Sequence, residues 1–283
     1  MKRRIAPTVL LLLLITLPLP AQLARQGVYT DHTVGGGLNP TALAFTSRLW
    51  YRAPLREERG ILWDPAKVDL GVRNQFSPAF EEFGAYVYWE PVAIFDLSAA
   101  VSFRRAFTAF GFGFQELESY DDSYRDLSDA SDENRGGFRF TVTPRLKGAY
   151  AGFVAVNELR IDTFDFGSNV SEAGKRYFYE PVYDTVLKLR DTVVANTTIL
   201  LYSLTPELRL GGQYYLRHVP GSDRTSHRFS AMGIYARPLS DGMSLFGALL
   251  AGGYAADRYR TGDLYLAGQV GLQARIWGAQ APQ

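Results

Sequence analysis

The sequence predicts an all-β fold, a transmembrane antiparallel up-and-down β-barrel. Roughly ten segments alternate apolar and polar residues, the period-two pattern of strands with one apolar and one polar face. Apart from one apolar run at the N-terminus, no stretch approaches the roughly 20 apolar residues that a membrane-spanning helix needs. Short and longer polar connections alternate from Pro91 onward, as in barrels with tight turns at one end and loops at the other.

Residues 1–24 have the composition of a secretory signal peptide. A charged start, Met1 to Arg4, precedes an apolar run from Val9 to Leu17, and small residues place the cleavage site near Ala21 or Ala24. We therefore expect export and removal of this segment. Residues 25–283 then remain as a single barrel domain.

The composition excludes several function classes. Loss of the signal peptide lowers the basic residues from 30 to 27 against 29 acidic ones, so the chain has no general attraction for nucleic acid. The absence of cysteine excludes disulfides, thiol chemistry and cysteine metal ligands. A mean hydropathy of −0.10 is compatible with a barrel, because polar residues that face a lumen offset the apolar outer band.

The most regular alternation lies at the C-terminus, where Leu264 to Ile276 place apolar residues on one face and polar residues on the other. A C-terminal strand that ends in the periplasm requires an even number of strands. We therefore expect either both early segments in the wall, giving twelve strands, or neither, giving ten; we favour twelve. The expected strands span residues 27–38, 42–52, 67–77, 83–90, 95–104, 138–143, 153–162, 192–203, 208–217, 228–237, 243–254 and 264–276.

The final segment, Gln269 to Trp277, carries a family resemblance. A polar residue and a glycine precede alternating apolar or aromatic positions, so the segment resembles the terminal signal of bacterial outer-membrane β-barrel proteins. The resemblance implies a location in the outer membrane, contact with its lipid, and recognition by the barrel-assembly machinery. It points to the general class and to no particular barrel family.

The polar faces of the expected strands carry many charges. Two interpretations stay open: rings of basic residues can form an anion-preferring pore, or Arg–carboxylate pairs can close a filled lumen. The candidate lumen-lining residues are Arg73, Arg104, Arg139, Arg145, Arg160, Arg209, Arg217 and Arg275, with Lys147, and the acids Asp69, Asp96, Glu158, Asp162 and Glu207.

These patterns favour a small passive channel for small solutes, with some anion preference, or a structural envelope protein. One alternative is a barrel-borne hydrolase acting on lipid or peptide at the outer surface, with His32, His218 or His227 as base. Another is a soluble secreted β-sandwich that binds a ligand, since its strands alternate in the same way. No catalytic residue, cofactor or metal site is predicted, and no oligomeric state.

Two further features have structural interpretations. Residues 115–135 are rich in Asp and Glu, but their spacing matches no Ca²⁺-binding loop, so we expect a solvated outer loop. Aromatic residues near the expected strand ends suggest girdles at the membrane interfaces. These residues are Trp50, Trp63, Trp89 and Trp277, with Tyr51, Tyr88, Tyr202 and Tyr254.

Overall fold

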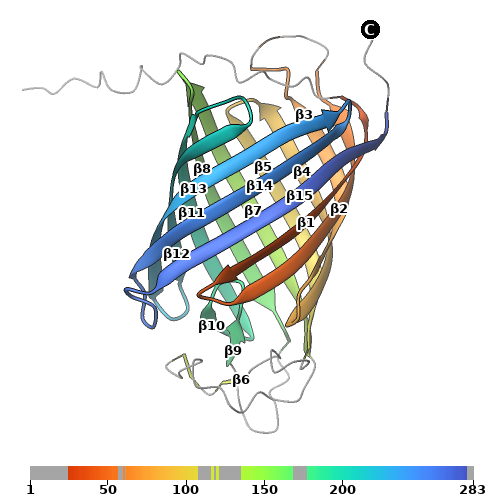
Figure 1. Cartoon of the computed structure of the whole chain (residues 1–283). Coiled ribbons are helices and arrows are strands. Elements are labelled where there is room, and N and C mark those ends of the chain that lie inside the picture. The colour runs from red at the N-terminus through yellow and green to blue at the C-terminus, as the bar shows by residue number, and fades with distance from the viewer. Residues whose placement is uncertain are drawn as a thin grey trace, which may run out of the picture.

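Twelve antiparallel strands close into a barrel in the computed structural model of the chain (Figure 1). The structure describes residues 25–56, 60, 62–107, 116–117, 119–120, 135–167 and 177–278. The predicted signal peptide and most of the acidic loop lie outside these residues. Within them, no helix is long and apolar enough to cross a membrane.

The wall confirms the prediction of twelve strands. The first segment, β1, pairs with β2 on one side and with the last strand, β15, on the other, which excludes the ten-strand alternative. The β-sandwich alternative is also wrong, because the sheet closes on itself. The wall strands are β1 (Gly27–Leu38), β2 (Ala42–Pro54), β3 (Lys67–Phe76), β4 (Phe80–Val92), β5 (Phe95–Ala106), β7 (Arg135–Tyr150), β8 (Phe153–Asp165), β11 (Arg190–Ser203), β12 (Leu208–Val219), β13 (Arg224–Ser240), β14 (Met243–Ala256) and β15 (Leu264–Trp277).

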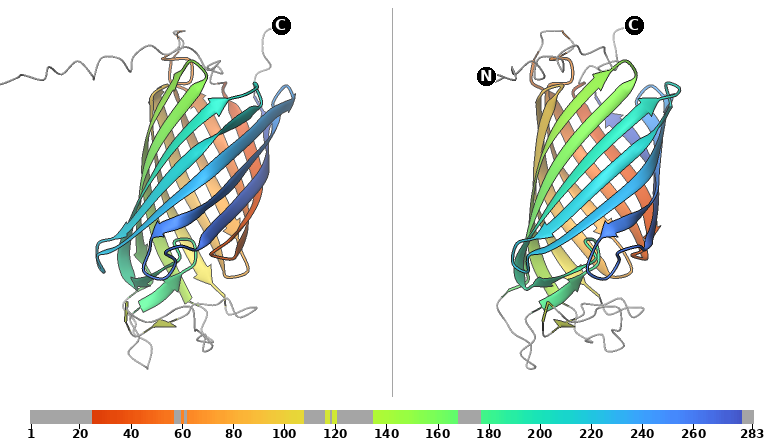
Figure 2. Two further views of the ribbon diagram at one scale, coloured as in Figure 1. Left: turned by 60° about the vertical axis from the view of Figure 1, so that its left-hand side comes forward. Right: turned by 90° about the vertical axis from the view of Figure 1, so that its left-hand side faces the viewer.

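The two ends of the barrel differ. At one end, which we call the turn end, β1 begins, β15 ends, and the β4–β5, β7–β8 and β13–β14 connections hold two residues each. The other end, which we call the loop end, carries the long connections β5–β7 and β8–β11 (Figure 2). This asymmetry agrees with the alternation of connection lengths in the sequence.

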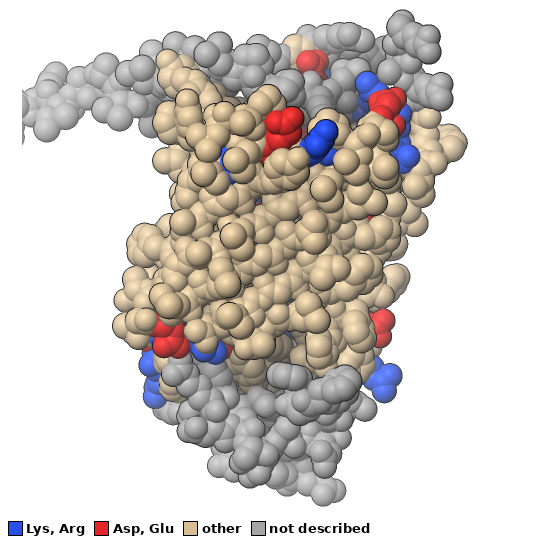
Figure 3. Space-filling model, in the orientation of Figure 1, with Lys and Arg blue, Asp and Glu red and all other residues tan. Residues whose placement is uncertain are grey.

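The two faces of the wall also differ. Outward-facing Leu70, Phe140, Leu200 and Val270 are all exposed, while charged side chains from alternate positions point inward. On the face shown in Figure 3, charged residues gather toward the two ends, and the broad band between them is almost free of charge. The pleat produces this separation, because successive side chains of a strand point to opposite faces.

The prediction of aromatic girdles is wrong for some of its residues. Trp50 is 5% exposed and stacks on Tyr29 at 5.6 Å between ring centroids, whereas its neighbour Tyr51 faces outward. Likewise Trp89 faces outward while the Tyr88 hydroxyl donates a hydrogen bond to Glu90 inside the barrel. Adjacent residues of one strand cannot share a face, so only one of each pair can lie in a girdle.

Part of the β8–β11 connection enters the loop end of the barrel. This inserted segment, residues 177–189, contains β9 (Tyr177–Glu180) and β10 (Thr185–Lys188), which form a small sheet with β6 (Glu116–Leu117). Phe178 and Leu187 are fully buried in a core with wall residues such as Phe164 and Val193. The expected strands left residues 163–191 as a connection at the outer end, and the inward fold of residues 177–189 is a correction to that expectation.

Candidate functional site

The lumen contains a cavity of about 490 Å³. Its lining runs from Arg52 and Lys67, which lie close to the turn end of β2 and β3, to Arg73, which lies toward the loop end of β3. Six basic and three acidic side chains line it, together with aromatic and hydroxyl groups. The charged residues are Arg48, Arg52, Lys67, Arg73, Arg145 and Arg160, and Asp31, Asp69 and Glu158.

Most of these charges form ion pairs across neighbouring strands. Arg52 lies directly opposite Asp69 in the β2–β3 register, and its Nη2 is 2.7 Å from the carboxylate. Arg145 lies directly opposite Asp96, with 2.7 Å between its Nε and the carboxylate. Arg48 is paired in the same way with Asp31. The pleat and the register therefore bring each base beside an acid.

The two members of each pair are unequally exposed. The side chain of Arg48 is 47% exposed and that of Asp31 is 3% exposed. Arg145 is 35% exposed while Asp96 is fully buried, and Arg160 is 30% exposed while its partner Asp162 is fully buried. The acids lie against the wall and the bases cover them. In these pairs a solute in the cavity meets the guanidinium group first, although the pairs themselves are neutral; Glu158, which is 31% exposed, also reaches the cavity.

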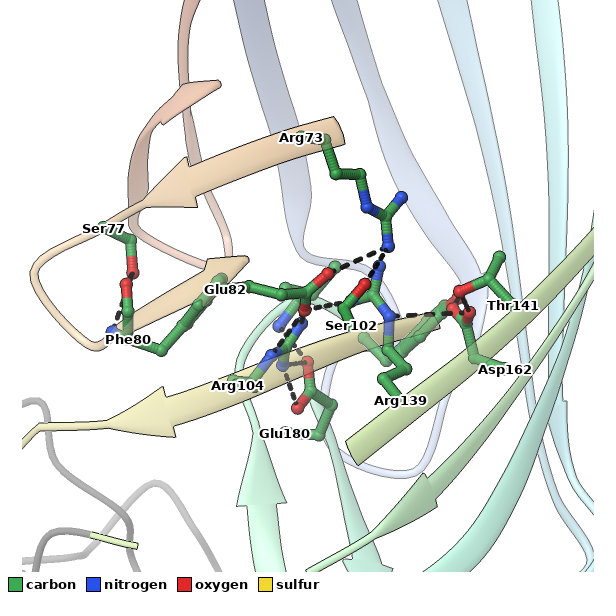
Figure 4. A network of polar contacts seen from close by, with 12 residues as sticks. Arg73, Ser77, Phe80, Glu82, Ser102, Arg104, Arg139, Thr141, Asp162 and Glu180 are labelled. Atoms are coloured by element: carbon green, nitrogen blue, oxygen red, sulfur yellow. Dashed lines mark hydrogen bonds and ion pairs between the residues drawn. The ribbon is translucent and has the colours of Figure 1, made fainter. Parts of the chain in front are cut away.

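Toward the loop end the charges form a closed network (Figure 4). The carboxylate of Glu82 lies 2.9 Å from Arg73, 2.7 Å from Arg104 and 3.0 Å from Arg139. Arg104 also binds Glu180 of the inserted segment at 2.6 Å, and both side chains are almost completely buried. Asp162 accepts hydrogen bonds from Thr141 and from Tyr183 of the inserted segment.

The remaining candidate residues lie apart from this network. Arg217 joins the inserted segment, because its Nη1 donates to the Asp184 carbonyl at 2.9 Å and its Nη2 to Asp257 at 2.9 Å. Arg275 contacts Asp241 at the turn end. Glu207 lies in the turn before β12 and not within a strand, so its assignment to the lumen wall is a correction. Arg209 lies on the inward face of β12, opposite to the exposed Leu210, and is not one of the residues that line the cavity.

Sequence reasoning missed several members of the site. Glu82 and Glu90 lie on the face of β4 opposite to Phe83 and Trp89. The period-two pattern that located the other lumen residues therefore also applied to these two. The role of Glu180 had no such signal. It lies 76 residues from Arg104 in the chain, and only the inward fold of its loop brings the two together.

The outer face of the wall shows whether water or membrane lipid surrounds the barrel. Every neighbouring pair of strands is hydrogen-bonded, and exposed apolar side chains surround the closed wall. A closed wall satisfies all backbone groups within hydrocarbon, and a water-soluble protein does not expose apolar patches on this scale. The protein is a bacterial outer-membrane β-barrel. Its turn end is the periplasmic end, its loop end faces outward, and its outer face contacts membrane lipid.

Comparison with known proteins gives the following similarities. No protein-family model and no curated protein matches the chain. The β domain of the Bordetella autotransporter BrkA is 8% identical, with 89% of this chain and all of that chain covered and a TM-score of 0.47. An outer-membrane channel from Pseudomonas putida F1, COG4313, is 11% identical, with 91% and 96% covered and a TM-score of 0.45. The KdgM porin in complex with disordered oligogalacturonate is 8% identical, with 88% and 99% covered and a TM-score of 0.41.

Each of the three histidines contacts a hydroxyl group. At the outer end, His218 Nδ1 lies 3.1 Å from Thr225 Oγ1, and His227 Nδ1 lies 2.7 Å from the Tyr214 hydroxyl. His32 contacts Ser47, but on the lipid-facing side of β1 and β2. Within the described residues, no group of three or more His, Asp or Glu side chains is arranged to hold a metal ion.

Strand β15 carries the segment that resembles the terminal signal. It pairs with β14 and β1 and so closes the wall. Recognition of this segment by the barrel-assembly machinery stays a prediction.

Proposed function

We propose that the protein is a small passive outer-membrane channel that prefers anionic solutes. The unequal exposure within the lumen ion pairs supports this proposal, since bases face the cavity and acids lie behind them. The cavity of about 490 Å³ has room for a small solute, since pockets for small molecules begin at roughly 300 Å³. Basic side chains around a pore attract anions and repel cations.

Ion selectivity in planar bilayers tests the proposal. The reversal potential in a KCl gradient should indicate preference for chloride in the unmodified protein. A triple variant, Arg48→Gln, Arg145→Gln and Arg160→Gln, removes the three most exposed cavity bases whose acid partners are buried, and should lose most of this preference. Arg190→Gln is the matched control, because Arg190 is 65% exposed beside Asp165 at the outer end of the wall.

Two results would contradict this proposal. One is preference for potassium in the unmodified protein. The other is equal selectivity in the triple variant and in the unmodified protein, since the cavity bases would then not govern which ions pass.

A structural envelope role is the second candidate. The buried core between the inserted segment and the wall favours it, because this core fills the outer end of the lumen. A structural barrel should give no current above background, either unmodified or after Glu180→Gln, which loosens the contact of the inserted segment with the wall.

A further inference from the structure

The inserted segment places a carboxylate on a cluster of wall guanidiniums. Glu180 contacts Arg104 Nη1 through both of its oxygens, at 2.7 and 2.6 Å. The other edge of the same guanidinium, Nε and Nη2, binds Glu82 of the wall at 2.8 and 2.7 Å. Arg104 therefore keeps one edge fixed by the barrel and presents the other edge to a group that the loop supplies (Figure 4).

The wall cluster is cationic without Glu180. Its guanidiniums are those of Arg73, Arg104, Arg139 and Arg160, and its carboxylates are those of Glu82 and Asp162. Glu180 supplies the third negative charge. A buried guanidinium edge with no partner is costly, so the site requires an anion whenever the inserted segment leaves it.

Arg104 is held in place independently of Glu180. Its guanidinium lies 4.1 Å from the ring centroid of Phe80 and 5.7 Å from that of Phe164, both wall residues. Together with Glu82, these rings fix the orientation of the guanidinium before any loop carboxylate arrives. Nη1 is thus a preorganised donor for a carboxylate, and both oxygens of Glu180 contact it.

We propose that Arg104 and its neighbours form a binding site for the carboxylate of a solute, and that Glu180 occupies this site when solute is absent. An incoming carboxylate replaces Glu180, which returns to water at the outer end, and the inserted segment leaves the lumen. The Arg104 ion pair is conserved in the exchange, because one carboxylate replaces another on the same guanidinium. This inference rests on the proposed channel function, for which it supplies a step that widens the outer end of the lumen when a carboxylate solute arrives.

Thiol labelling tests the displacement directly. The chain has no cysteine, so a Val193→Cys variant carries one thiol. Val193 lies on β11 in the core shared with the inserted segment and is fully buried. We expect slow reaction with a small charged thiol reagent in this variant. Adding Glu180→Gln should speed the reaction by about tenfold or more, because the segment loses its charged contact with Arg104 and keeps only weaker support from contacts such as that of Asp184 with Arg260.

Succinate provides the second part of the test. It should speed labelling of the Val193→Cys variant in a saturable way, and should have much less effect after Glu180→Gln, in which the segment is already released. Chloride at equal ionic strength is the control for charge screening. Asp165→Asn in the Val193→Cys background is the control variant, because Asp165 forms an exposed pair outside the lumen.

Equal labelling rates with and without Glu180→Gln would overturn the inference, as would an absence of any succinate effect on the Val193→Cys variant. If Glu180→Gln does not fold, Glu180→Asp replaces it, since the shorter acid keeps its charge and loses reach. The Asp variant should label at an intermediate rate, and a rate equal to that of the Val193→Cys variant would count against the inference. Labelling needs no current, so a failure here is distinguishable from a failure of the channel proposal.

Discussion

Replacing Glu82 with glutamine should destabilise the barrel more than any other single neutralisation in the lumen. The Glu82 carboxylate is 1% exposed and lies within 3.0 Å of three guanidiniums. After Glu82→Gln, Arg104 still forms its ion pair with Glu180, and Arg139 still lies 3.6 Å from Asp162. Arg73 loses its carboxylate partner and retains its hydrogen bond to the Ser102 hydroxyl. Removing one partner of a buried pair costs about 3–5 kcal/mol, so we expect a loss of unfolding free energy in this range.

Glu158→Gln is the matched control. It is the same substitution in the same lumen, but Glu158 is 31% exposed and lies 3.7 Å from Arg145. Such a pair contributes less than about 1 kcal/mol. Both variants can be unfolded with guanidinium chloride from phospholipid vesicles, with tryptophan fluorescence as the signal. Equal losses in the two variants would refute the reasoning, because burial and the number of partners would then not determine the cost.

Two other regions of the wall give stability predictions in the same assay. On the lipid-facing side, Ser47 lies 3.0 Å from His32 Nδ1, so Ser47→Ala should cost about 1–3 kcal/mol by leaving a ring nitrogen without a partner in hydrocarbon. His32→Leu removes the polar ring itself and should cost less. At Gly211 a Cβ would meet the Leu200 carbonyl oxygen at 1.9 Å, so Gly211→Ala should cost about 1–3 kcal/mol. At Gly148 nothing lies within 4 Å of an added Cβ, so Gly148→Ala should change the unfolding free energy by no more than about 0.5 kcal/mol. A larger loss in His32→Leu than in Ser47→Ala, or in Gly148→Ala than in Gly211→Ala, would contradict these contacts.

The wall could be predicted from sequence because a closed barrel repeats one local rule. Each strand alternates between lipid and lumen, so Leu264 to Ile276 reveal their two faces without knowledge of their neighbours. The parity of the strand count then placed the irregular first segment, Gly27–Leu38, in the wall. The aromatic prediction failed where it ignored this rule, by assigning the adjacent residues Trp50 and Tyr51 to the same surface.

The inserted segment could not be predicted in this way. Its strands β9 and β10 hold four residues each, too short for a periodic signal. Its position depends on contacts such as that between Glu180 and Arg104. These two residues are distant in the chain and belong to different strands. Alternation assigns a residue to a face of its own strand, and it carries no information about a loop that folds back into the lumen.

The sequence left a basic pore and a set of ion pairs as alternatives, and side-chain length explains why the proposed basic surface is compatible with the observed ion pairs. Asp31, Asp69 and Asp96 have one methylene group, so their carboxylates stay close to the wall. The arginines opposite them are long enough to extend over these carboxylates toward the cavity. Among the acids that line the cavity, Glu158 is the longest and the most exposed. Pairs of Asp with Arg across neighbouring strands therefore neutralise each other's charge while the guanidinium stays the more exposed partner.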